Sequence, residues 1–344
     1  MNQKKKVSII IPVYKTKKDS LDICITSITD QEYKEYEIII VDDGNDSDYA
    51  RMLDEYAHNR HITVVHQKNA GASSARNRGI AKATGEFIVF VDSDDKIAKG
   101  FLSQGVTYME NYNLDIVLGG YTVDGKEHIP LCEQIKIYDE KNIRYLKEFF
   151  VSGFGTSETM ELKNCLGFVA PWGKIFRKEA VEEVRFDEKL ILSEDNLYNL
   201  YCIEKAKRIG IVPKCWYDYF VTDGSICHKY RKNAFEEIRL SMDGFEKFVK
   251  DSTEPDAIFE SALGYRMLRQ LDSILKYYIC NYEYDEKKPV HKLKQFLKIN
   301  HYKSVKADKR FYISKGYNIL FLLAKIEWAA GIYFFYKLKE RSKK

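Results

Sequence analysis

The chain has 344 residues, 45% of them hydrophobic, and a formal net charge of +4. This length allows one large domain with an appendage or two domains, and the balanced charge gives no reason to expect a nucleic acid partner. The seven cysteines are odd in number and include no CxxC pair, which argues against a disulfide framework or a zinc site and favours a reduced, cytoplasmic protein.

The first 120 residues alternate short apolar runs with helical patterns, which is typical of a parallel sheet built from β-α-β units. Each apolar run is rich in β-branched residues and almost continuous, as expected for strands covered by helices on both faces. The sequence therefore predicts an α/β fold with a mostly parallel sheet. The expected strands are 7–11, 38–41, 62–65, 87–91 and 114–118, and the expected helices between them are 21–29, 49–58 and 73–83.

Acidic residues follow the fourth expected strand directly, in the run Asp92-Ser93-Asp94-Asp95. Like charges this close together cost free energy unless a cation shares them. Asp92 and Asp94 are two residues apart and could project toward one point, as oxygen ligands that suit Mg²⁺ or Mn²⁺. An acidic turn that caps the next helix is the alternative explanation.

Polar residues also follow the first three expected strands, at 12–14, 42–44 and 67–71. In an open parallel sheet these loops lie along the carboxyl edge of the strands, where ligands bind. If these polar residues only formed turns, that explanation would have to hold independently at four loops. Their position along one edge therefore favours a site for a metal and a ligand.

The alternation of strands and helices fades after about Tyr121, and the pattern past Lys232 is helical and rich in aromatic residues. We therefore divide the chain into regions 1–120, 121–231 and 232–344.

The segment 317–336 is apolar on almost all sides and is interrupted by Asn318, Lys325 and Glu327. Its Leu, Ile and Phe residues favour membrane insertion by about 3 to 5 kcal/mol, whereas Lys325 and Glu327 together oppose it by roughly 5 to 7 kcal/mol. With basic residues on both sides, the segment predicts a helix that lies at an anionic membrane surface. A helix packed on the protein's own core is the alternative.

Four blocks of the first 95 residues resemble glycosyltransferase family 2, and they occur in the order typical of that family. They are 9–14, 40–44, 69–79 and 85–95. Together they form a specific signal, although each one alone is weak. The resemblance implies a GT-A fold and an inverting transfer of sugar from a nucleotide diphosphate sugar. Region 1–120 would bind the donor, and region 121–231 would bind the acceptor and carry out catalysis.

The resemblance assigns the nucleotide site to loops at the sheet edge. Pro12 and Tyr14 would line it, with the Tyr14 ring facing the base. Asp42 or Asp43 would accept a hydrogen bond from the base, with uracil and Asp43 favoured, while a turn before Gly44 is the alternative for this pair. Gly71 would give the backbone room to approach the nucleotide.

The diphosphate end of the donor is assigned to the next helix and to the acidic loop. Arg76 and Asn77 lie on the helix, where a guanidinium can pair with phosphate or base oxygens. Asp94 is the principal metal ligand implied, and Asp92 is a second ligand to the metal or the donor. Asp95 would be structural and could cap the helix after the loop.

The acceptor side is assigned to two later motifs. Asp195, in the pair Glu194-Asp195, resembles the family's catalytic carboxylate and would be the general base, with Glu194 beside it in the acceptor site. An N-cap run at 193–196 is the alternative. Trp172, followed by Lys174, resembles a block that shapes the acceptor pocket, whereas a buried core Trp is the simpler explanation.

Two departures from related sequences bear on the prediction. No basic residue precedes Ser225-Ile226, so His228 or Lys229 would have to contact the diphosphate instead. The Gln-x-x-Arg-Trp block of processive synthases is absent, which favours an enzyme that adds one sugar.

The sequence thus predicts a Mn²⁺- or Mg²⁺-dependent enzyme that moves one sugar, from a UDP-sugar by preference, to a hydroxyl of a glycan or lipid-linked oligosaccharide precursor in cell-surface or exopolysaccharide synthesis. It would be cytoplasmic and peripheral on the inner face of the cell membrane, with no nucleic acid partner. The alternative is a non-catalytic glycan- or membrane-binding protein on a degenerate glycosyltransferase scaffold. The intact Asp92, Asp94 and Asp195 argue against that alternative.

Overall fold

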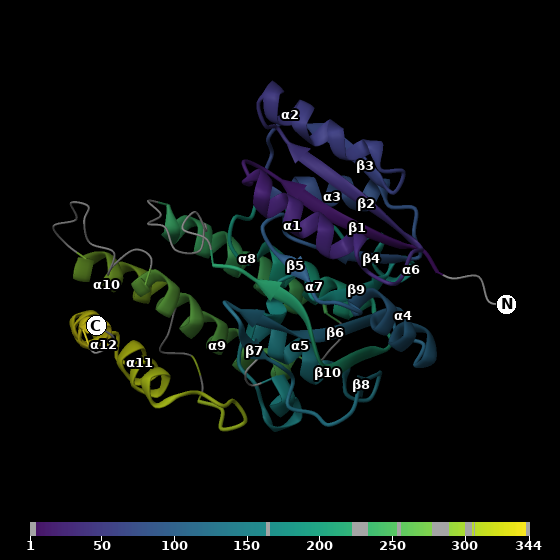
Figure 1. The fold of residues 1–344 in the computed structure, drawn as a ribbon. Helices are drawn as coiled ribbons and strands as arrows, with labels where there is room; N and C mark the ends of the chain where they lie inside the picture. The colour runs from purple at the N-terminus through teal and green to yellow at the C-terminus, as the bar shows by residue number, and fades with distance from the viewer. Residues whose placement is uncertain are drawn as a thin grey trace. The chain divides into compact units, whose positions relative to one another are not determined.

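The computed structural model describes residues 5–162, 166–221, 233–252, 256–276, 289–299, 305 and 307–341. The chain forms two compact units, one made of residues 1–146 and 161–221 and the other of residues 147–160 and 222–344. Figure 1 shows that the first unit holds the sheet and that helices dominate the second.

The first unit is built on a sheet whose described strands follow the order β3-β2-β1-β4-β9-β6-β10-β5, with β7 beside β6 and β8 beside β10. The pairs β1–β2, β1–β4, β2–β3 and β6–β10 are parallel, whereas β9 runs antiparallel to both β4 and β6. The strands are β1 (Val7–Val13), β2 (Tyr36–Asp43), β3 (Ile62–Gln67), β4 (Phe87–Phe90), β5 (Lys96–Ile97), β6 (Ile116–Val123), β7 (Lys126–His128), β8 (Lys136–Tyr138), β9 (Lys174–Arg177) and β10 (Ile209–Tyr219).

Helices connect the strands of this sheet. They are α1 (Lys18–Thr29), α2 (Ser47–Asp54), α3 (Ala72–Lys82), α4 (Phe101–Asn111), α5 (Ile143–Ser152), α6 (Lys178–Val181) and α7 (Glu194–Lys205), with short 3₁₀ helices at Glu55–His58, Ser157–Leu162 and Leu166–Val169. Of these, α5 and the 3₁₀ helix Ser157–Leu162 belong only in part to the first unit. The α/β class and the parallel N-terminal strands that the sequence predicts are confirmed.

Local sequence explains the position of two of these helices. The Asp46 side chain accepts hydrogen bonds from the backbone N–H groups of Asp48 and Tyr49, which fixes the start of α2. Helix α3 packs so closely on β1 that a Cβ on Gly79 would lie 2.3 Å from Cγ2 of Ile10. Only glycine allows this approach, which holds α3 against β1.

The second unit contains the C-terminal helices α8 (Ala234–Asp251), α9 (Asp256–Ile274), α10 (Pro289–Ile299), α11 (Lys315–Lys325) and α12 (Ala329–Arg341). It also takes in residues 147–160, which the regions proposed from sequence had left with the sheet. Arg266 on α9 donates 2.6 Å hydrogen bonds to the carbonyl oxygens of Phe150 and Val151. Arg269 donates to the Gly153 carbonyl at 2.6 and 3.1 Å, so two arginines tie this segment to α9.

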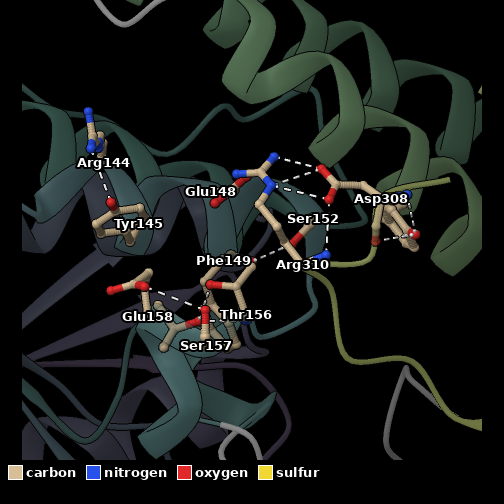
Figure 2. A network of polar contacts seen from close by, with 12 residues as sticks. Arg144, Tyr145, Glu148, Phe149, Ser152, Thr156, Ser157, Glu158, Asp308 and Arg310 are labelled. Atoms are coloured by element: carbon tan, nitrogen blue, oxygen red, sulfur yellow. Dashed lines mark hydrogen bonds and ion pairs between the residues drawn. The ribbon is translucent and has the colours of Figure 1, made fainter. Parts of the chain in front are cut away.

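A charged cluster strengthens the same unit (Figure 2). Arg310 forms ion pairs with Glu148 at 3.0 Å and with Asp308 at 2.6 Å. The Glu148 side chain is only 1% exposed, and a carboxylate this well buried requires a charged partner.

The C-terminal apolar segment forms two helices where the sequence predicted one. Helix α11 ends in a turn in which Glu327 has φ +52° and the N–H of Trp328 donates to the Leu323 carbonyl at 3.0 Å. This is the 6→1 bond of a Schellman motif. Its left-handed position usually carries Gly, and because Glu327 occupies it here, the sequence contained no stop signal. No helix among the described residues is long and apolar enough to cross a membrane.

Candidate functional site

The carboxyl end of β1 supplies an exposed aromatic ring. Tyr14, directly after the strand, is 47% exposed, and the ammonium of Lys15 lies 5.1 Å from its ring centroid. Pro12 pairs with Val41 of β2 one residue before the strand ends. Both predicted nucleotide-site residues therefore lie at the expected sheet edge.

Asp43, at the end of β2, organises the neighbouring loop. Its carboxylate accepts hydrogen bonds from the backbone N–H groups of Ala70 and Gly71, at 2.8 and 2.9 Å, and from the side-chain amides of Gln67 and Asn69, at 2.8 and 3.2 Å. A carboxylate can accept about four hydrogen bonds, so these four leave the Asp43 carboxylate no free acceptor position. A base that binds Asp43 would have to replace one of the two side-chain donors.

Asp42 also has partners of its own. It accepts a 3.0 Å hydrogen bond from the backbone N–H of Asn45 and is paired with Nδ1 of His66 at 2.7 Å. Hydrogen bonds to Asp42 and Asp54 raise the pKa of His66 above its usual value. The two acids that end β2 therefore shape the loops at this edge of the sheet.

Glycine is required at both turns of this edge. Gly44 has φ +76°, and a Cβ there would lie 2.4 Å from the backbone nitrogen of Asn69. Gly71 has φ +91°, and a Cβ there would meet nothing within 4 Å. The space above Gly71 is consistent with the predicted approach of a nucleotide to the backbone.

Arg76 joins two carboxylates that lie far apart in the sequence. Its guanidinium donates to Oδ1 of Asp92 at 2.9 Å and to Oδ1 of Asp195 at 2.8 Å. The Arg76 side chain is 6% exposed, whereas those of Asp92 and Asp195 are 29% and 28% exposed. Burial alone would lower the pKa of Arg76, but the two carboxylates raise it above its usual value. The sequence predicted phosphate or base oxygens as its partners, and this pairing with carboxylates was missed.

Asp195 lies in the first turn of α7, as the sequence predicts. Ser193 precedes the helix with φ +65°, and its side chain makes no capping hydrogen bond. Burial raises the pKa of Asp195, and the Arg76 charge opposes this shift. The buried Asn199 side chain donates to the carbonyl oxygens of Asp195 and Ala170, at 2.9 and 3.0 Å, and thereby links the start of α7 to the segment before Trp172.

Trp172 is 8% exposed and stacks on Tyr217, with ring centroids 4.4 Å apart and planes at 3°. The buried ammonium of Lys174 donates to the backbone carbonyls of Ala170 and Trp172. Burial lowers the pKa of Lys174 to about 7. Lys174 thus holds the turn that carries Trp172, and an acceptor role for Trp172 stays a prediction.

Tyr217, which sequence reasoning missed, joins this aromatic stack to the acidic loop. Its buried hydroxyl accepts a 3.0 Å hydrogen bond from the Asp92 N–H and donates at 2.8 Å to Oδ2 of Asp95. Oδ1 of Asp95 accepts from the Phe220 N–H at 2.9 Å. Asp95 therefore ties the loop to β10, and the expectation that it caps the next helix is wrong, because α4 follows Gly100 with no side-chain cap.

Removing only the Tyr217 hydroxyl tests this link. Tyr217→Phe keeps the ring but removes the hydrogen bonds that the hydroxyl makes with Oδ2 of Asp95 and with the Asp92 N–H. We expect the free energy of unfolding, measured by urea denaturation, to fall by about 1–3 kcal/mol. Tyr14→Phe, which removes an exposed hydroxyl, is the control and should change it by less than about 0.5 kcal/mol. Equal stability of the two variants would contradict the structural role of the hydroxyl.

The acidic loop fits a cation only in part. No group of three or more His, Cys, Asp or Glu side chains within the described ranges could hold a metal ion. Asp92 is engaged by Arg76, and Asp94 lies beside it, partly exposed. Mg²⁺ is usually held by one or two carboxylates together with substrate phosphates. The two aspartates fit this shared arrangement better than a closed metal site built by the protein.

Three predictions remain, for Asn77, for Glu194 and for the pair His228 and Lys229. The Asn77 side chain donates to the Phe186 carbonyl at 2.9 Å and accepts from the Phe186 N–H at 2.8 Å, so it holds residues 186–188 beside α3. Glu194 begins α7 next to Asp195. His228 and Lys229 lie outside the described residues.

Comparisons with known proteins agree with the sequence blocks. A family model described as Glycosyl transferase family 2 matches residues 8–185, which is more than half of the chain. Glycosyltransferase GlyA of Streptococcus pneumoniae is 29% identical over 229 residues, covering 64% of this chain but only 31% of GlyA.

Solved structures share the fold. TarS 1–349 of S. aureus, in complex with UDP-GlcNAc, is 18% identical with a TM-score of 0.70, and the match covers 98% of this chain and 92% of that one. The mannosyltransferase PcManGT of Pyrobaculum calidifontis, in complex with GDP-Man and Mn²⁺, is 15% identical with a TM-score of 0.55, covering 96% and 87% of the two chains. The predicted GT-A fold with a helical C-terminal region is confirmed.

Proposed function

The chain belongs to glycosyltransferase family 2, and from this premise we propose that it transfers one sugar, with inversion, from a nucleoside diphosphate sugar to an acceptor hydroxyl. The observation that carries the proposal is the Arg76 bridge between Asp92 and Asp195. It holds a carboxylate of the donor edge and a carboxylate of the acceptor side within reach of one guanidinium. An inverting displacement requires this proximity, because nucleophile and leaving group act at one carbon.

Donor binding is assigned to the loops at the sheet edge. The exposed ring of Tyr14 would stack on the base, and the open space above Gly71 would receive the nucleotide. UDP is the favoured nucleotide, in keeping with the uracil prediction and with the ligand named for TarS. Asp94, with Asp92, would hold a Mn²⁺ or Mg²⁺ ion, which supplies positive charge to the departing diphosphate.

Asp195 is assigned the role of general base. The acceptor oxygen would bond to the anomeric carbon while the bond from that carbon to the diphosphate oxygen breaks, and the hydroxyl proton would pass to the Asp195 carboxylate. Burial disfavours the charged carboxylate, and Arg76 opposes that effect. The bridge would therefore keep Asp195 ionised and oriented before the acceptor arrives.

The acceptor we propose is a glycan or lipid-linked oligosaccharide precursor at the inner face of the cell membrane. Trp172 and Glu194 would contact it, because both lie on segments connected to Asp195, through Asn199 and the first turn of α7 respectively. The chain spans about a third of the length of GlyA.

A panel of nucleotide sugars with Mn²⁺, Mg²⁺ or EDTA tests the donor site. We expect one of them to raise the melting temperature in a metal-dependent way, and saturation at about 100 times Kd corresponds to roughly 2.7 kcal/mol of stabilisation. Asp94→Ala should abolish the metal-dependent part of this shift and the slow hydrolysis of the donor. Thermal shift and release of nucleoside diphosphate are the two measurements.

The control is Asp30→Ala, which removes an exposed aspartate after α1 and should retain the full shift. If no nucleotide sugar stabilises the wild-type protein, the transferase proposal fails. Stabilisation without any hydrolysis or transfer would instead favour the non-catalytic binding protein.

A further inference from the structure

The hairpin of α11 and α12 exposes apolar side chains in regular stripes. Along α11 and its end these are Ile319, Leu322 and Ile326, which are 43%, 62% and 66% exposed. Along α12 they are Phe334 and Leu338, which are 65% and 49% exposed. Spacings of three and four residues place each set on one side of its helix.

The exposed apolar residues of the hairpin do not take part in its packing on the rest of the second unit. Each helix has a second apolar face that is buried within its own unit. The buried residues are Leu320, Phe321 and Ala324 on α11, and Ala329, Ile332 and Tyr336 on α12. Helices that serve only the core usually turn a polar face outward. The outward apolar residues of this hairpin are therefore available to a partner.

The turn between the helices carries an exposed indole. Trp328 is 56% exposed, and it follows Ile326 and Glu327 at the point where α11 ends. Trp is enriched where a membrane meets water, because its ring is apolar while its N–H can bond with headgroups or water. Ile326 and Trp328, on either side of Glu327, thus present side chains suited to the interfacial region of a bilayer.

The charge of the hairpin is positive and flanks the apolar stripes. Between residues 315 and 341 there are five Lys or Arg residues and two acidic ones. The basic residues are Lys315, Lys325, Lys337, Lys339 and Arg341, and the acidic ones are Glu327 and Glu340. Basic residues beside an apolar helix face are the pattern that binds anionic lipid surfaces. A second copy of the chain would bring like charges together and is disfavoured as the occupant.

We propose that the α11–α12 hairpin, meaning residues 315–341 with its exposed apolar stripes, docks on an anionic lipid bilayer and lies in the headgroup plane. With 11 and 13 residues, the helices are roughly 16 and 20 Å long, against about 30 Å for the hydrocarbon core. The inference deepens the proposed function and rests on it for one point only, the inner-face location of the acceptor. The docking surface itself is independent of the transfer reaction.

Vesicle flotation of the full chain tests the hairpin. Vesicles of phosphatidylcholine with phosphatidylglycerol should carry the wild-type protein, those of phosphatidylcholine alone should carry much less, and added salt should weaken binding. The double variant Leu322→Ser/Phe334→Ser should lower the partition coefficient for the anionic vesicles by about tenfold or more, since two apolar anchors are lost. Lys315→Glu/Lys325→Glu should reduce binding to anionic vesicles and leave the weak binding to neutral ones unchanged.

The matched control is Ile23→Ser, which removes a 55% exposed apolar residue of α1 and should float like the wild type. Melting temperature and the nucleotide-sugar thermal shift of every variant show whether the fold and the donor site are intact. If the wild type fails to float with anionic vesicles while the donor shift is present, the docking proposal is overturned and the transferase proposal stands. Light scattering that shows a dimer lost in Leu322→Ser/Phe334→Ser would assign the surface to a second copy and also overturn it.

Discussion

Replacing Asp195 by Asn is expected to lower kcat by about 10²–10⁴, because general-base catalysis contributes a factor of this size. The amide oxygen can still accept the hydrogen bond from Arg76, so the geometry of the bridge should be kept. Donor affinity should change little, since Asp195 is assigned to the acceptor hydroxyl. Nucleoside diphosphate release under saturating donor gives kcat, and isothermal titration with the donor gives Kd.

Two further measurements make the Asp195 result specific. Glu183→Gln removes an exposed carboxylate from the same unit and should leave kcat unchanged. Because burial raises the pKa of Asp195 and a base must be deprotonated, wild-type kcat should fall on the acid side at a pH above the usual Asp pKa. A parallel loss of donor affinity and kcat in Asp195→Asn would assign the residue to the structure of the site.

The second large effect is expected from Arg76→Met. This change removes the guanidinium that pairs with both Asp92 and Asp195 and leaves two partly buried carboxylates close together. Breaking a buried ion pair lowers the free energy of unfolding by roughly 3–5 kcal/mol. We expect a loss of about 3 kcal/mol, the lower end of this range, because the side chains of both carboxylates are more than a quarter exposed. Urea denaturation measures the loss, and transfer activity should fall with it.

A second substitution on α3 shows whether the loss of stability comes from the Arg76 ion pairs or from any change to this helix. Arg78→Met, on the exposed side of the same helix, should change stability by less than about 0.5 kcal/mol. In a double-mutant cycle, Asp195→Asn should cost less in the Arg76→Met background than in the wild type, since the unpaired charge is then removed. Equal stability of Arg76→Met and Arg78→Met would contradict the bridge.

Much of the N-terminal part of the sheet, up to residue 95, could be predicted from the sequence. The strands ending at Val13, Asp43 and Phe90 have apolar runs that only a covered sheet explains, and the polar residues after them share one edge because the strands are parallel. The order of the four blocks then identified the family. These signals are local, so they do not depend on contacts between distant segments.

Two of the missed features depend on contacts between distant segments. Arg76 and Asp195 are 119 positions apart, and nothing near either residue indicates the other. In the sequence, Tyr217 looks like an ordinary strand residue, yet its hydroxyl forms a hydrogen bond with the acidic loop 125 positions away. Glu327 shows a further reason, because it adopts a left-handed conformation that residue preference assigns to Gly.

The position of β9 in the sheet bears on how the first unit folds. β9 comes from residues 174–177, yet it lies between β4 and β6, so it fills the place beside a strand formed much earlier in the chain. Until those residues have been synthesised, the edge of β4 that faces away from β1 has no neighbouring strand, and Arg76 lacks one of its two carboxylates. The proposed donor and acceptor regions, which meet near residue 120, therefore share one sheet, and neither can complete it without the other.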